Sequence, residues 1–139
     1  MMSALVHGYH LHANGIRLHL LRYGGNGRPL LLLPGITSPA ITWGFVAQRL
    51  ARHFEVHVLD FRGRGLSFSA PGMDASLDAM AADVLAVLEQ LGGEPPIVLG
   101  HSMGARVAIR AAARDASRFG RLLLVDPPVT GPGRRAYPA

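Results

Sequence analysis

The chain has 139 residues, which gives one domain at most and is long enough to bury a hydrophobic core. With 49% hydrophobic and 17% charged residues, no cysteine and no apolar run of membrane-spanning length, it reads as a soluble domain without a disulfide framework. The start of the chain lacks the pattern of a signal peptide, so we expect a cytoplasmic protein that does not bind membranes. The net charge of +5 comes from scattered basic residues without interleaved aromatics, and we expect no nucleic-acid partner.

The first part of the chain predicts a hairpin, a buried strand and a helix. Residues 9–23 alternate loosely around Asn14-Gly15, a strong signal for two antiparallel strands joined by a tight turn. The apolar run 30–33 predicts a strand buried on both faces. A helix is expected over 41–53, where the apolar positions at helical spacing are Phe45, Val46 and Leu50.

Strands and helices continue to alternate along the rest of the chain. Residues 55–60 predict a strand, and Ser76 is expected to cap a helix over 77–91 that Gly92-Gly93 ends. The remaining expected elements are a strand over 96–99, a helix over 105–113, a strand over 122–125 and a loop over 131–139. This order predicts an α/β fold in which an antiparallel hairpin precedes a mostly parallel sheet.

The pentapeptide Gly100-His101-Ser102-Met103-Gly104 stands between an expected strand and an expected helix. Gly-x-Ser-x-Gly in that place is the sequence form of a nucleophile elbow, a tight turn that lifts the serine hydroxyl above the sheet edge. The two glycines lack a Cβ and so let the turn pass close to strand and helix backbone. The following helix aims its first N–H groups at the same spot, where they can bind a developing oxyanion.

Three segments should meet at the carboxyl edge of the parallel sheet. Ser102 is the candidate nucleophile, and the backbone N–H groups of Ile36 and Met103 are the natural oxyanion donors. Asp126 ends the last expected strand, where it either orients a histidine or only caps the following loop. Asp60 also ends a strand, but the Arg-Gly-Arg-Gly that follows indicates a structural turn.

Taken together, the elbow, Leu33-Pro34-Gly35 and the segment 60–67 resemble the amino-terminal half of the α/β-hydrolases. The segments 34–46, 100–106 and 125–138 are similar to those of the bacterial N-formylmaleamate deformylases, amide hydrolases of nicotinate breakdown. The resemblance implies removal of formate from the small molecule N-formylmaleamate, leaving maleamate, without metal or cofactor.

For this chain the resemblance implies a catalytic triad with Ser102 as nucleophile and Asp126 as acid, and an oxyanion hole at Ile36 and Met103. It further implies that residues 1–139 form a partial domain, with the lid, the last strands and the catalytic histidine expected beyond Ala139. The seven histidines present are expected to be surface or packing residues.

Two other hypotheses about the function of the chain stay open. One is a different hydrolase of the same fold, such as a carboxylesterase. The other is a non-catalytic fragment, because the last strand would present an open sheet edge that favours self-association.

Overall fold

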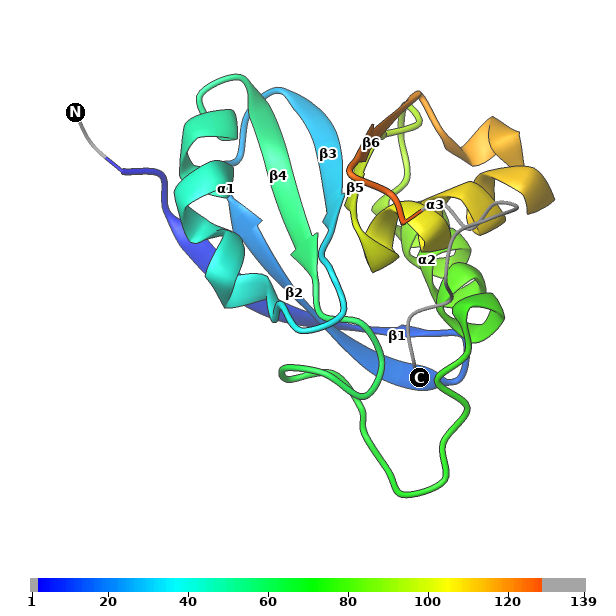
Figure 1. Ribbon diagram of the computed structural model, residues 1–139. Coiled ribbons are helices and arrows are strands. Elements are labelled where there is room, and N and C mark those ends of the chain that lie inside the picture. Colours follow the sequence, from blue (N-terminus) through cyan, green and yellow to red (C-terminus); the bar gives the residue numbers. More distant parts are fainter. Residues whose placement is uncertain (1–2, 129–139) are drawn as a thin grey trace.

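A computed structural model describes residues 3–128 as a six-stranded sheet with helices on both faces (Figure 1). The strands are β1 (Val6–Ala13), β2 (Ile16–Tyr23), β3 (Arg28–Leu33), β4 (Phe54–Leu59), β5 (Ile97–His101) and β6 (Arg121–Val125). The helices are η1 (Ala40–Trp43), α1 (Gly44–Leu50), α2 (Leu77–Leu91), α3 (Met103–Arg114) and η2 (Ala116–Arg118), of which η1 and η2 are 3₁₀ turns. The expected loop over 131–139 lies outside the described residues.

The strand order in the sheet is β1-β2-β4-β3-β5-β6. The β1–β2 hairpin turns at Asn14 and Gly15, both of which have a positive φ, and β2 also runs antiparallel to β4. The pairs β3–β4, β3–β5 and β5–β6 are parallel. The predicted α/β fold, with a hairpin before a parallel sheet, is therefore confirmed.

Apolar side chains on the two faces of the sheet form two separate cores. α2 and α3 cover one face, where Leu18, Leu31 and Leu59 contribute to the core. η1 and α1 cover the other face, together with side chains such as Leu32 and Val58 (Figure 1). Because β3 and β4 contribute to both cores, their continuous apolar runs are explained by burial on both faces.

Two helices test the local predictions. Helix α2 occupies the expected residues, and Ser76 caps it by accepting a hydrogen bond from the Ala79 N–H at 3.1 Å. The helix expected over 41–53 is shorter than predicted: a 3₁₀ turn precedes α1, which ends at Leu50 and contains Phe45, Val46 and Leu50. Phe45 is 73% exposed because Ala40 and Ala47 are the side chains that face the sheet.

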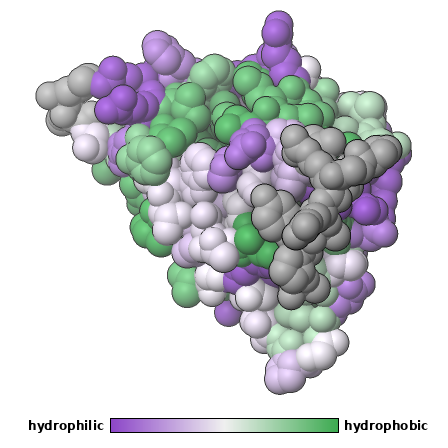
Figure 2. Space-filling model, viewed as in Figure 1, coloured by the Kyte–Doolittle hydropathy of each residue, from purple (hydrophilic) through white to green (hydrophobic). Residues whose placement is uncertain are grey.

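The last strand, β6, lies at the edge of the sheet in the described part of the chain. Its apolar residues 122–125 are 37–46% exposed, and Figure 2 shows green side chains at the surface in this region. Among residues 3–128 no helix combines the length and the apolar character needed to cross a membrane.

Candidate active site

Ser102 joins β5 to α3 and has a backbone conformation that few residues other than glycine adopt, with φ 52° and ψ −116°. Such strain persists only where surrounding structure enforces it, and it clusters at functional sites. Here the enforcing contacts include the Ala105 N–H, which donates to the Ser102 carbonyl oxygen at 3.0 Å. The predicted strand–turn–helix at Ser102 is present.

The glycines of the pentapeptide are required by close backbone contacts. A Cβ added at Gly100 would lie 2.7 Å from the Ala105 Cα. A Cβ added at Gly104 would overlap the Leu33 carbonyl oxygen and lie 2.6 Å from that of Pro34. The elbow therefore rests directly on the end of β3, as the sequence indicated for a turn that needs two residues without a Cβ.

The segment after β3 lies beside the serine. A Cβ added at Gly35 would be 3.5 Å from the Ser102 Cβ, so the neighbouring Ile36 stands at the rim of the same turn. Ile36 lies in a turn, and its N–H donates no backbone hydrogen bond among the described residues. Met103 is the first residue of α3, so its N–H has no acceptor within the helix. Met103 thus follows Ser102 directly, Ile36 follows a residue that packs against Ser102, and neither N–H makes a hydrogen bond within residues 3–128.

Asp126 reaches the same edge of the sheet because β5 and β6 are paired in parallel. His101 is the register partner of Val125, and the Ser102 N–H donates to the Val125 carbonyl oxygen at 3.0 Å. Asp126 follows directly, is exposed and has φ 48°. The turn therefore brings Asp126 next to the elbow, while its role as triad acid stays a prediction.

Three of the seven histidines, His19, His57 and His101, contact side chains other than Ser102. No hydrogen bond of residues 3–128 joins Ser102 Oγ to a histidine, and the His101 ring packs against Trp43, with 5.3 Å between ring centroids. His57 is buried, with Nδ1 2.6 Å from the Tyr9 hydroxyl and Nε2 2.8 Å from the Glu55 carboxylate. Burial lowers the pKa of His57 despite the opposing effect of Glu55.

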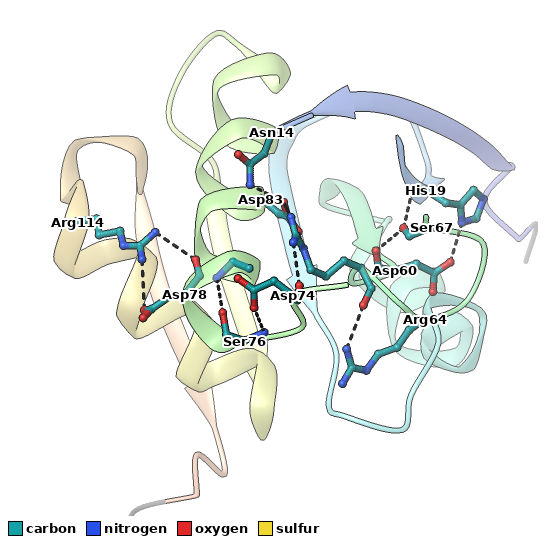
Figure 3. A network of polar contacts seen from close by, with 12 residues as sticks. Asn14, His19, Asp60, Arg64, Ser67, Asp74, Ser76, Asp78, Asp83 and Arg114 are labelled. Atoms are coloured by element: carbon teal, nitrogen blue, oxygen red, sulfur yellow. Dashed lines mark hydrogen bonds and ion pairs between the residues drawn. The ribbon is translucent and has the colours of Figure 1, made fainter. Parts of the chain in front are cut away.

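Asp60 is a buried structural residue, as its sequence context indicated. Its carboxylate accepts hydrogen bonds from the N–H groups of Ala40 at 2.7 Å and Leu66 at 3.2 Å, and one oxygen lies 2.8 Å from His19 Nδ1. The Ser67 hydroxyl donates to the Asp60 carbonyl oxygen at 2.6 Å. These contacts close the loop after β4 and connect it to the start of η1. Figure 3 shows Asp60 with its partners His19 and Ser67.

Two arginines of that loop were not singled out from the sequence as site residues, although segment 60–67 contributed to the resemblance. Arg62 forms a buried, two-pronged pair with Asp83 of α2, with nitrogen–oxygen distances of 2.6 and 2.7 Å. Asn14 also donates to Asp83, at 2.9 Å. Arg64 instead reaches the segment beside the elbow, where its Nε donates to the Ile36 carbonyl oxygen at 2.9 Å.

Comparison with known proteins places these features in a family. The sequence profile described as Alpha/beta hydrolase family matches residues 30–139. The N-formylmaleamate deformylase of Pseudomonas putida is 62% identical over 138 residues, covering 99% of this chain and 52% of that protein. Lipase LipV of Mycobacterium tuberculosis is 36% identical over 126 residues, covering 86% of this chain and 45% of that protein.

The fold comparison agrees. The crystal structure of the N-formylmaleamic acid deformylase from Pseudomonas putida S16, solved as a serine-to-alanine variant, matches with a TM-score of 0.88 and 62% identity. The match covers 96% of this chain and 52% of that one. This chain spans about half the length of the curated relatives it matches.

Proposed function

The chain belongs to the alpha/beta hydrolase family, and on that footing we propose that it supplies the nucleophile and oxyanion hole of a serine hydrolase acting on small amides. One observation carries the proposal: Ser102 has the strained conformation typical of a nucleophile at a strand–helix junction, near two backbone N–H groups that make no hydrogen bond within residues 3–128. Glycine would adopt this conformation without strain, so a serine in this place points to a role for its hydroxyl.

In the proposed reaction the Ser102 oxygen attacks the amide carbonyl carbon while its proton passes to a histidine base. The carbonyl oxygen takes the negative charge and is bound by the N–H groups of Ile36 and Met103. The C–N bond then breaks, and the histidine returns the proton to the leaving nitrogen. Water attacks the acyl-serine in the same way and releases the acid, with Asp126 holding the histidine in the required tautomer.

We assign the base to a histidine other than the seven of this sequence. His19 and His57 are paired with carboxylates, and His101 packs on Trp43. None of the hydrogen bonds of the described residues joins a histidine to the serine hydroxyl. The proposed triad therefore needs a residue beyond Ala139, together with the lid and last strands that the resemblance implies.

The proposed substrate is N-formylmaleamate, which would give formate and maleamate and place the enzyme in nicotinate breakdown. The support is the 62% identity to the Pseudomonas putida deformylase across nearly all of this chain. The alternative within the family is an ester substrate, which the 36% identity to lipase LipV favours. The route uses only side-chain and backbone groups, and we propose the cytoplasm as its compartment.

The full-length protein that the gene encodes should be assayed for formate release from N-formylmaleamate and for hydrolysis of p-nitrophenyl acetate. We expect the deformylation to be faster, and Ser102→Ala to abolish it. Ser117→Ala is the matched control, because that exposed serine lies in η2, beyond the end of α3, and among residues 3–128 its hydroxyl bonds to Asp115. Substantial formate release by the Ser102→Ala protein would overturn the serine mechanism, and faster ester hydrolysis would overturn the substrate.

A further inference from the structure

We propose that Arg64 is a positioning residue for the oxyanion loop, defined here as residues 34–37. The inference rests on the proposed function, in which the Ile36 N–H binds the oxyanion. Arg64 does not contact the reacting atoms in this proposal. It holds the loop in the conformation that aims the Ile36 N–H at the carbonyl oxygen bound to Ser102.

The guanidinium of Arg64 bridges two loops. Its Nε donates to the Ile36 carbonyl oxygen at 2.9 Å, and its Nη1 donates to the Arg62 carbonyl oxygen at 3.1 Å. Figure 3 shows the Arg64 side chain extended from the loop after β4. Because one rigid, planar group makes both bonds, the two carbonyl oxygens are fixed relative to each other.

The oxyanion loop is pinned on both sides of the Ile36 Cα. The carbonyl oxygen of Gly35, in the peptide that carries the Ile36 N–H, accepts a hydrogen bond from the Ser38 N–H at 3.3 Å. In a trans peptide the N–H points opposite to the C=O, so this bond also restrains the direction of the Ile36 N–H. Arg64 holds the next peptide through its carbonyl oxygen, and without it the longer Gly35–Ser38 bond would be the remaining hydrogen bond of the oxyanion loop among residues 3–128.

Arg64 itself stands on a rigid base. Its N–H donates to the Phe61 carbonyl oxygen at 3.0 Å, and Phe61 is a core residue. Arg62, in the same loop, pairs with Asp83 of α2. The Asp60 carboxylate accepts a hydrogen bond from the Leu66 N–H and so closes the loop. These contacts therefore fix the position of the Ile36 carbonyl relative to α2 and β4.

The charge of Arg64 adds to the effect of its hydrogen bonds. Partial burial lowers the pKa of Arg64 from its usual value, yet a guanidinium keeps its proton at neutral pH. It polarises the peptide that joins Ile36 to Thr37, because a hydrogen bond from a charged donor is stronger than one between neutral groups. An arginine in this place both fixes the loop and favours negative charge near it.

The test compares Arg64→Ala, Arg64→Lys and the control Arg110→Ala in the full-length protein. The control removes an arginine whose ion pair among residues 3–128 is an exposed one, with Asp78. For Arg64→Ala we expect kcat to fall by about 10- to 100-fold with KM changed by less than about twofold, because transition-state alignment is lost while ground-state contacts remain. The kcat of Arg64→Lys should lie between those of the unchanged protein and of Arg64→Ala, because an ammonium keeps the charge but lacks the planar set of donors of a guanidinium.

Chemical rescue separates positioning from a general effect on folding. Added guanidinium ion, below denaturing concentration, should restore part of the activity of Arg64→Ala and none of the activity of Ser102→Ala. A phosphonate probe should label Ser102 more slowly in Arg64→Ala by a factor similar to the loss in kcat.

The outcomes distinguish this inference from the proposed function. An active Ser102→Ala protein would remove the serine mechanism and the role of Arg64 with it. An inactive Ser102→Ala protein beside an Arg64→Ala protein with unchanged kcat would overturn only the role of Arg64. A raised KM at unchanged kcat would likewise overturn it, since it would make Arg64 a substrate-binding residue. Loss of kcat that guanidinium does not restore would show that Arg64 acts on folding alone.

Discussion

Replacing Gly104 by alanine should separate the elbow from the end of β3. The added Cβ would overlap the Leu33 carbonyl oxygen and lie 2.6 Å from the Pro34 carbonyl oxygen, where a relaxed contact needs about 3.5 Å. Both atoms are backbone, so no side-chain rotation relieves the overlap. The start of α3 or the end of β3 must therefore move by about 1 Å.

That displacement acts on the distance between the two proposed oxyanion donors, because Met103 moves with α3 and Ile36 with the segment after β3. A misplacement of about 1 Å at a catalytic site costs on the order of 100-fold in rate. Overpacking a tight contact also costs about 1–3 kcal/mol of stability. We expect Gly104→Ala to show both losses in the full-length protein, measured by formate release and by urea unfolding.

The matched control is Gly25→Ala, since a Cβ there meets only the end of the Arg22 side chain, at 3.9 Å. It should leave rate and stability unchanged. If Gly104→Ala kept both the rate and the stability of the unchanged protein, the close packing of the elbow on β3 would not be required, and the reasoning from backbone overlap would be refuted.

Three further predictions concern stability and association. Asp83→Ala leaves Arg62 buried without its carboxylate partner and should lower the free energy of unfolding, measured in urea, by about 3–5 kcal/mol. Asp78→Ala, on the exposed side of the same helix, should lower it by less than about 1 kcal/mol. Similar losses in the two variants would contradict this. Because burial lowers the pKa of His57 in the folded state, the unfolded state binds the proton more readily, and stability should fall as the pH drops through about 6.5. His57→Gln should lose less stability over that range than the unchanged protein, and an equal loss would count against the linkage. The 139-residue chain should self-associate through the exposed edge strand β6. In light scattering, Leu123→Lys should reduce the mass of the associated species, while Leu5→Lys, outside the sheet, should not. A monodisperse monomer would show that β6 does not mediate association.

The arrangement of elements was accessible from the sequence because each depends on short-range constraints. The apolar run of β3 requires burial on both faces, the Asn14-Gly15 pair favours the hairpin turn, and Ser76 caps its own helix. The elbow could be predicted for the same reason, because the two glycines and the serine that define it lie within five residues of sequence. The bounds of helix 41–53 were predicted less well, because the spacing of apolar residues did not distinguish the 3₁₀ turn over Ala40–Trp43 from the α-helix that follows and ends at Leu50.

The loop contacts around the site needed the tertiary structure. Asp60 meets His19 only because β4 pairs with β2, and Arg64 meets Ile36 only because β4 lies next to β3. Arg62 finds Asp83 because the chain returns over the sheet as α2. A sequence shows that such charged residues exist but not which of them meet, because partners separated by about 20 to 40 positions are brought together only by the order of the strands. The sequence alone thus determined the nucleophile candidate and its turn, and the fold decided what holds the neighbouring loop in place.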